Sequence, residues 1–600
     1  MKQFFKYFLA SGLAYIVFGT IFLFIAIGII SSQFNSGPDP VRVKKNTILK
    51  LELNRPIGDR TFSQPTFNGE GIEDVGKMGI NSIINSINYA KTDDKIQGLY
   101  LQFGMLSVGL ANLEEIRDAI EDFKSSGKFV VSYSEGYTQG TYYLASLSDE
   151  IYLYPTGSLS WSGLSSERMF FKNMLDKLEV DVQIIRGSNN KFKSAVEPFF
   201  LDKMSDANRE QTEKYMFSFW NHMVGEVSKS RGISVEDLNK IADEMAISNA
   251  TKAVDYKFVT AVKYEDEVHQ ILKDKVGMEE DDELKIMKLS KYMEYAGRKM
   301  TIKNRKFNIA MVYANGDIMS GKGGPETIGS ETTVAHLRKA RLNDSVKAVV
   351  LRVNSPGGSA LASDVIWREI ELIKKAGKPV VVSMGDLAAS GGYYISCNAD
   401  RIFAQENTIT GSIGVFGIIP NAEKFLENKI GITFDRAKTN EHADLMSFTK
   451  ALSDEEYKVI QMEVDRIYDD FISKVAIGRN MTKSQVDSIG QGRVWSGKDA
   501  IGINLVDEIG GIEEAINYAA KLAEIENPIV LEIPRAKKDP FEEFLKAVSQ
   551  GEEDNSYTST MIQSNTMTSE VFEILKAMQH INIQSKDRIQ ARLPYVINIK

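Results

Sequence analysis

Cysteine and histidine are scarce in this chain. Its 600 residues include one cysteine, Cys397, and five histidines. A single cysteine excludes an internal disulfide framework and a multi-cysteine zinc site. No two histidines have the spacing of a metal-binding motif. We therefore expect no metal site and no cofactor, and any hydrolytic chemistry has few histidines to use.

Blocks of basic residues are also missing. The net charge is -9, and it is spread over the whole length. Nucleic acid is therefore not an expected partner. The hydrophobic content of 43% and the charged content of 26% are ordinary for a globular protein. A chain of this length has room for several domains.

Charge is absent from Tyr7 to Pro38. Within this stretch, residues 7–30, "YFLASGLAYIVFGTIFLFIAIGII", are apolar over a length that spans a bilayer. Lys2 and Lys6 precede the stretch, which favours an N-terminus in the cytoplasm. We interpret it as an uncleaved transmembrane anchor, with everything after residue 40 outside the cytoplasm.

A cleavable signal peptide is the alternative reading of the same stretch. Its apolar core is expected to be only about 7–15 residues long. The sequence that follows, "GIISSQ", is a poor cleavage site. The anchor is therefore the preferred interpretation.

The rest of the chain contains an internal duplication. "DDKIQGLYLQF" (93–103) matches "NDSVKAVVLRV" (343–353) at an offset of 250, and "YYLASLSDEIY" (142–152) matches "YYISCNADRIF" (393–403) at 251. The helical stripe of Ile116, Ile120 and Phe123 recurs in the second copy, and so does a β-branched run. Four matches in the same order indicate two copies of one unit.

Each copy reads as strand, helix, strand, small-residue turn, helix, strand. This order predicts an α/β fold of mostly parallel sheets with helices packed outside. The predicted organisation is an anchor (1–40), a first repeat (41–275), a linker or connecting helix (276–306), a second repeat (307–535) and a polar C-terminal tail (536–600) whose last residues are apolar enough to dock as a strand.

The copies differ where the second one has "NSPGGSA", residues 354–360. The corresponding stretch of the first copy, "GMLSVGL", lacks the proline and the paired glycines. Gly357 and Gly358 could expose backbone N–H groups to a ligand, as an oxyanion hole requires. A plain turn between a strand and a helix is the alternative.

The second difference is a serine in "GDLAASGGYYIS", residues 385–396. Ser390 follows the buried run "KPVVVSM" and is surrounded by alanines and glycines. One reading is a tight strand-to-helix turn, and the other is a nucleophile that an extended substrate must reach. The residue of the first copy that corresponds to Ser390 is Gln139. A serine and paired glycines at two strand ends favour an acyl-transfer site.

A nucleophilic serine needs a base, and no histidine has a sequence context that marks it as one. A lysine can serve if burial lowers its pKa. Lys193, in "NNKFKSAVEPFF", precedes an apolar run and is flanked by Phe192, Phe199 and Phe200. The second copy has no lysine at the corresponding position, near residue 444. The hypothesis is therefore that one site straddles the two copies.

These motifs together resemble a known family. "KSAVEPF", "NSPGGS", "GDLAASGGYYIS" and "TGSIGVFG" (410–417), together with the terminal "RIQARLPY", resemble the long tandem form of the bacterial signal peptide peptidase A (protease IV) family, of the crotonase/ClpP-like serine peptidases. The resemblance covers nearly the whole chain, including the apolar N-terminus.

The resemblance implies a membrane-anchored serine endopeptidase with a Ser-Lys dyad. Position by position, it makes Ser390 the nucleophile and Lys193 the general base, with Gly358 and Gly391 as oxyanion donors. The implied substrates are the signal peptides left in the membrane after cleavage. The family also implies a homotetramer in the bacterial cytoplasmic (inner) membrane, with its catalytic part on the extracytoplasmic (periplasmic) side.

Two other classes of function remain open from the residues alone. One is a crotonase-type CoA-thioester enzyme, which shares the fold and stabilises an enolate with two backbone N–H groups. The other is a non-catalytic membrane scaffold in which Ser390 is only a turn residue.

Overall fold

The computed structural model describes residues 18–19, 41–62, 65–67, 72–74, 76–104, 106–300, 307–324, 326–534 and 589–592. Nearly all of the predicted anchor and most of the predicted tail lie outside these residues. Among the helices of the described part, none is both long and apolar enough to cross a bilayer.

The first half of the chain forms a six-stranded sheet in which every pairing is parallel. In spatial order its strands are β10 (Ala261–Val262), β8 (Glu150–Leu159), β7 (Phe129–Tyr137), β6 (Ile96–Leu101), β1 (Thr47–Leu51) and β11 (Ile286–Lys288). Two small ribbons accompany it: β2 (Ile57–Gly58) with β5 (Met78–Gly79), and β3 (Pro65–Phe67) with β4 (Ile72–Asp74).

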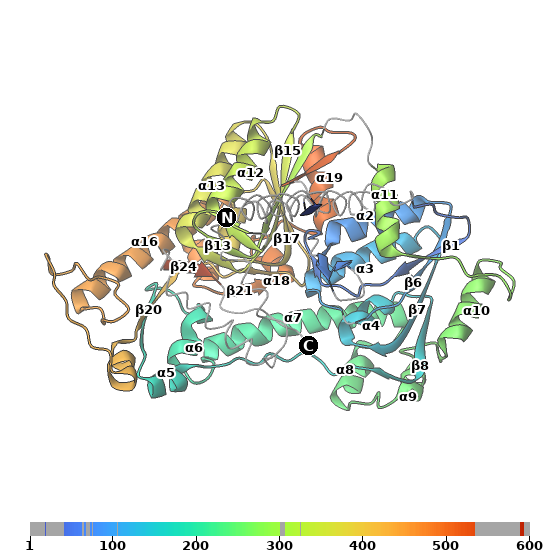
Figure 1. The fold of residues 1–600 in the computed structure, drawn as a ribbon, viewed down its shortest axis with the longest axis horizontal. Coiled ribbons are helices and arrows are strands. Elements are labelled where there is room, and N and C mark those ends of the chain that lie inside the picture. Colours follow the sequence, from blue (N-terminus) through green and yellow to red (C-terminus); the bar gives the residue numbers. More distant parts are fainter. Residues whose placement is uncertain are drawn as a thin grey trace, which may run out of the picture.

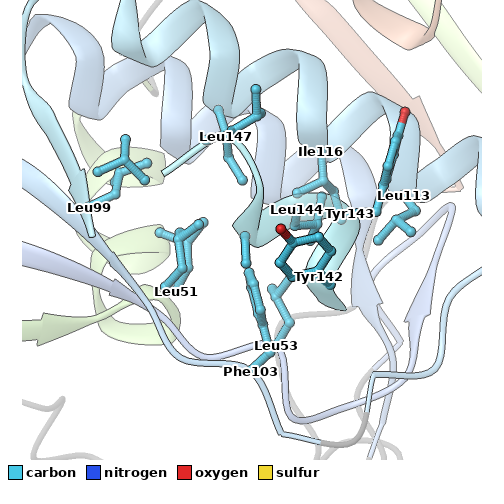
Figure 2. Close-up of a cluster of buried hydrophobic side chains, with 14 of the residues drawn as sticks. Leu51, Leu53, Leu99, Phe103, Leu113, Ile116, Tyr142, Tyr143, Leu144 and Leu147 are labelled. Carbon is cyan, nitrogen blue, oxygen red and sulfur yellow. The ribbon is translucent and has the colours of Figure 1, made fainter. Parts of the chain in front are cut away.

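The first half and the segment that follows it contain these helices. They are α2 (Ile80–Thr92), α3 (Leu110–Lys124), α4 (Gln139–Ala145), α5 (Lys172–Leu178), the 3₁₀-helix η1 (Ser194–Val196), α6 (Glu197–Phe200), α7 (Asp206–Arg231), α8 (Val235–Asp243), α9 (Ala250–Asp255), α10 (Glu265–Lys275) and α11 (Leu289–Met300). The stripe of Ile116, Ile120 and Phe123 is buried, as its helical spacing predicts. Figure 2 shows Leu113 and Ile116 beside Tyr142 and Leu144 in this core.

The second half forms an eight-stranded sheet that is parallel except at one edge. Its main path is β21 (Val494–Ser496), β19 (Ile409–Gly411), β17 (Val380–Ala389), β15 (Ala348–Ser355), β12 (Ile309–Asn315) and β23 (Val530–Ile533), with β18 (Arg401–Ala404) on β17 and β22 (Glu508–Ile509) on β18. Its helices are α12 (Ser330–Leu342), α13 (Ala360–Lys375), α14 (Gly391–Ser396), α15 (Glu423–Phe425), the π-helix η2 (Leu426–Ile430), α16 (Asp454–Gly478), α17 (Lys483–Ile489), α18 (Gly497–Gly502) and α19 (Ile512–Leu522).

The two halves repeat the same succession of elements. The segment α2–β6–α3–β7–α4–β8 corresponds to α12–β15–α13–β17–α14–β18. The central strands β6 and β15 each pair on one side with β1 or β12 and on the other with β7 or β17. The prediction of an α/β fold with mostly parallel sheets is therefore confirmed.

The predicted linker contains regular structure. Strand β11 pairs with β1 of the first sheet. Helix α11 places Leu289, Tyr292 and Ala296 in the core of the first half. The segment thus connects the halves and also completes the first one.

A third sheet combines segments that lie far apart in the sequence. Its strand order is β14 (Thr327–Gly329), β13 (Asp317–Met319), β16 (Gly357–Ser359), β24 (Ile589–Arg592), β20 (Phe416–Asn421) and β9 (Asp181–Arg186). Strand β9 comes from the first half and pairs antiparallel with β20 of the second. Strand β24 lies within the C-terminal stretch that was predicted to dock as a strand, and the residues after it lie outside the described part.

Helix α7 lies against both halves (Figure 1). Its C-terminal half buries Trp220 and Val224 in the core of the first half. Its preceding turns place Phe219 and Tyr215 in a cluster with Ala389, next to Ser390. A single rigid element therefore fixes the first half against the end of β17.

Candidate active site

Ser390 lies at the point where strand β17 turns into helix α14. Its φ is 55° and its ψ is −115°, a backbone conformation that costs a non-glycine residue about 1–3 kcal/mol. The backbone N–H of Ser390 donates to the carbonyl of Gly411 at 2.8 Å and holds this turn in place. Strain of this kind is concentrated at functional sites.

Lys193 reaches the serine from the other half of the chain. It caps the N-terminus of η1, and its side chain is 1% exposed. Its Nζ lies 2.9 Å from Ser390 Oγ, within hydrogen-bond distance. Folding therefore brings together the two residues that the sequence singled out as candidate nucleophile and candidate base.

The environment of Lys193 disfavours a charged ammonium. Burial lowers the pKa of Lys193 well below its usual value, because the charged form loses its hydration. The ring of Phe416 lies 5.9 Å from Nζ, whereas Phe199, one of the rings expected from the sequence to desolvate the lysine, stacks on Phe171. A neutral amine at this place can accept a proton from the serine hydroxyl.

A further serine, Ser412, orients the lysine. Lys193 Nζ donates to the Ser412 carbonyl at 3.1 Å and lies 3.0 Å from its Oγ. Together with Ser390, these acceptors fix the direction of the amine. Sequence reasoning did not single out Ser412, although it lies within the quoted stretch "TGSIGVFG".

Gly492 lets the chain approach Lys193 closely. Its φ is +80°, and a Cβ placed there would lie 2.5–2.6 Å from the Lys193 N, Cα and Cβ atoms. Phe192, just before the lysine, donates its N–H to the carbonyl of Gln491. The backbone of the second half therefore packs directly against the segment that carries Lys193.

The two candidate oxyanion glycines lie at neighbouring strand ends. Gly358 is in β16 with a φ of +156°, and a Cβ on it would lie 2.0 Å from the carbonyl oxygen of Ile318. Gly391 is the first residue of α14, where an N–H has no partner within the helix. Their role as oxyanion donors stays a prediction.

The position of the first copy that matches Ser390, and the position of the second copy that matches Lys193, hold residues with other roles. Gln139 Oε1 accepts from the N–H groups of Ser162 and Gly163, so this side chain braces a loop. Asp444 forms ion pairs with Lys438 and Lys450. Neither offers a second serine–lysine pair.

Two of the histidines in the described part of the chain contact carboxylates instead of Ser390. His222 contacts Glu114 and Glu406, and His442 contacts Glu456. In the same part of the chain, no group of acidic, histidine or cysteine side chains has the arrangement of a metal site.

Comparison with known proteins identifies the family. The model of "Peptidase family S49" matches the chain twice, at residues 122–279 and 373–526. "Protease 4" of Haemophilus influenzae is 40% identical over 76% of this chain and 74% of its own length. "Protease 4" of Salmonella typhi is 36% identical over 85% of this chain and 84% of its own. The chain belongs to peptidase family S49.

Membership in this family makes the protein a serine peptidase. The double match also confirms the duplication seen in the sequence, with Lys193 in the first matched region and Ser390 in the second. A shorter relative, "Putative signal peptide peptidase SppA" of Enterococcus faecium, is 40% identical over 34% of this chain and 60% of its own length.

Proposed function

We propose that this peptidase is a membrane-anchored endopeptidase that uses Ser390 as nucleophile and Lys193 as general base, and that it degrades cleaved signal peptides. The observation that carries the proposal is the 2.9 Å contact between the serine hydroxyl and a buried lysine amine. Each half is a ClpP/crotonase-like unit in this proposal, and the site forms where the two units meet.

The proposed reaction uses the serine and lysine as a nucleophile and its base. Ser390 Oγ attacks the carbonyl carbon of the peptide bond while neutral Lys193 takes the hydroxyl proton. The N–H groups of Gly358 and Gly391 stabilise the negative oxygen. The ammonium then returns the proton to the leaving amine, leaving an acyl-enzyme on Ser390. Water, deprotonated by the same lysine, releases the second product and restores the serine.

Signal peptides are the proposed substrates for two reasons. The relative from Enterococcus faecium carries the name signal peptide peptidase. An enzyme held in the membrane by residues 7–30 also meets apolar peptides at the membrane surface. Cleavage of a synthetic signal peptide by the purified protein tests the proposal, and labelling of Ser390 by a fluorophosphonate distinguishes it from a CoA-thioester enzyme or a scaffold.

A peptide would bind in the third sheet, between β16 and β20. Extended peptides commonly bind by adding a strand to a sheet edge, and β16 and β20 offer such an edge only where no other strand lies between them. The chain's own β24 occupies this place, pairing antiparallel with β16 through Gly357, Gly358 and Ser359 and with β20 through Phe416 and Gly417. Ser390 is fully buried in this arrangement. A substrate that pairs with both strands therefore has to replace β24.

Removing β24 is expected to raise activity at low substrate concentration. A chain that ends at residue 588 lacks the strand, whereas a matched chain that ends at residue 592 keeps it. We expect kcat/KM to rise roughly tenfold in the shorter chain, because β24 no longer has to leave its place between β16 and β20 before the peptide binds. Peptide hydrolysis by the two chains, side by side, measures the effect. Equal or lower kcat/KM in the shorter chain would contradict this binding mode.

The proposal includes a homotetramer in the bacterial cytoplasmic membrane, with the catalytic part on the extracytoplasmic side. The apolar residues 7–30 and the preceding Lys2 and Lys6 support the anchor and its orientation. The tetramer is proposed from the resemblance of the sequence to the family.

A membrane preparation tests location and assembly together. The protein should stay with the membrane in high salt and leave it in detergent, and light scattering should give four chain masses. Protease added to spheroplasts should degrade most of the chain. Protection of the large domain would contradict the orientation, and a monomer in detergent would contradict the tetramer.

A further inference from the structure

A fully buried arginine joins the two halves behind the candidate active site. Arg352 lies on β15, and its side chain is 0% exposed. Its Nε donates to Asp59 Oδ1 at 2.6 Å. Its Nη2 lies 2.7 Å from Glu115 Oε1 and donates to Asn112 Oδ1 at 2.6 Å. All three partners belong to the first half of the chain.

The same guanidinium also holds the strand that ends at the serine. Arg352 Nη1 donates to Ser383 Oγ at 2.7 Å and to the Met384 carbonyl at 3.3 Å. Both partners are on β17, which ends at Ala389, immediately before Ser390. Strand β15, which carries the arginine, leads into the glycine turn of β16. Arg352 therefore touches both strands whose ends form the candidate site.

Neighbouring side chains extend this network across the junction. Asn354 Nδ2 donates to Asp59 Oδ2 at 2.6 Å. Asp386, on β17, accepts from the backbone N–H of Asn112 at 3.0 Å and from its Nδ2 at 2.8 Å. The Cβ that a side chain at Gly109 would need lies 2.1 Å from Asp386 Cγ. The first half is thus packed directly onto the strand that carries the serine.

A guanidinium is planar and presents its donors in a fixed fork. Buried without partners it is costly, so this network is satisfied only when the halves have one relative placement. We propose that Arg352 is a positioning residue, which fixes the first half against β17 and so sets the placement of Lys193 relative to Ser390. The inference rests on the proposed function of this pair. At the duplication offset of 250 the first copy has Gln102, so the arginine is particular to the second copy.

The variant Arg352→Met in the full-length protein tests this role. We expect kcat to fall roughly 10- to 100-fold, since an error of about 1 Å between reacting groups has effects of that size. KM should change little, because no peptide-binding strand is altered. The acid limb of the pH–kcat profile should move up by about one pH unit, because a displacement that parts Lys193 from Ser390 and Ser412 undoes some of its burial and lets its pKa rise toward the usual value.

A matched control separates positioning from stability. Arg479 is buried and pairs with Asp507 at 2.7 Å, with both residues in the second half. Arg479→Met loses a buried ion pair as well, and we expect it to lower the melting temperature without moving the acid limb. Asp59→Asn removes a partner of Arg352 from the first half and should move the acid limb in the same direction as Arg352→Met. Active sites are counted by fluorophosphonate titration, so that unfolded protein does not enter kcat.

The outcomes are distinguishable. If folded Arg352→Met and Asp59→Asn keep kcat within twofold and an unmoved acid limb, Arg352 has no positioning role while the proposed function stands. If Arg352→Met and Arg479→Met shift the pH–kcat profile by the same amount, the shift reflects general destabilisation and the inference fails. If the unaltered protein neither cleaves peptide nor labels at Ser390, the proposed function fails and this inference with it.

Discussion

Ser390→Ala is expected to reduce peptide hydrolysis by on the order of 10⁴-fold or more. Removing a serine nucleophile abolishes the covalent route, and what remains comes from binding and the oxyanion donors alone. The substitution deletes one oxygen from a buried, strained position. The fold should therefore survive, and the melting temperature should stay close to that of the unaltered protein.

Ser396→Ala is the matched control for this variant. Ser396 is another buried serine, at the end of α14, and its hydroxyl donates to the carbonyl of Gly392. It should keep activity and probe labelling, whereas Ser390→Ala should lose both. Hydrolysis by Ser390→Ala within tenfold of the unaltered protein would mean that the nucleophile lies elsewhere.

Lys193→Arg is expected to be as inactive as Lys193→Ala, again by several orders of magnitude. A guanidinium stays protonated in proteins and cannot accept the serine proton. Fluorophosphonate labelling and peptide hydrolysis should fall together, because both require deprotonation of Ser390.

The unaltered protein should show the protonation of Lys193 in its pH dependence. Burial lowers the lysine pKa, and the base works only in its neutral form. Activity is therefore full above that lowered pKa and falls as the pH drops through it. Measuring kcat/KM against pH locates the limb, which should lie well below the usual lysine pKa of about 10.4.

Lys191→Arg provides the comparison for the lysine variants. Lys191 is exposed and lies two residues away in the same loop, so its substitution should leave kcat/KM unchanged. Substantial activity in Lys193→Arg would show that the base is another group.

Local signals predicted much of the fold. The offset of about 250 residues revealed the duplication, because copies of a helical stripe or a buried strand keep their apolar spacing. The small residues around Ser390 and the paired glycines at 357–358 marked two strand ends. The resemblance to a family then assigned the roles of Ser390 and Lys193, which composition and periodicity could not do.

The sequence did not predict which side chains come into contact when distant segments pack together. Ser412 looks like part of a glycine-rich turn, and only the folded chain brings its oxygens to Lys193. Arg352 stands in a strand pattern as a single charged residue, with no sign that its partners are Asp59 and Glu115. Its burial is tolerable only because residues more than 200 positions away supply carboxylates.

The sequence by itself determined that this protein has two related α/β halves, a charge-free apolar N-terminus, and a serine and a lysine that are not in the same copy. The tertiary structure decided that these two residues meet, 197 positions apart, at 2.9 Å. It also decided that β9 of the first half and β24 of the tail join a sheet of the second. Periodicity records which face of an element is buried, whereas the partner of that face is fixed by the packing of the whole chain.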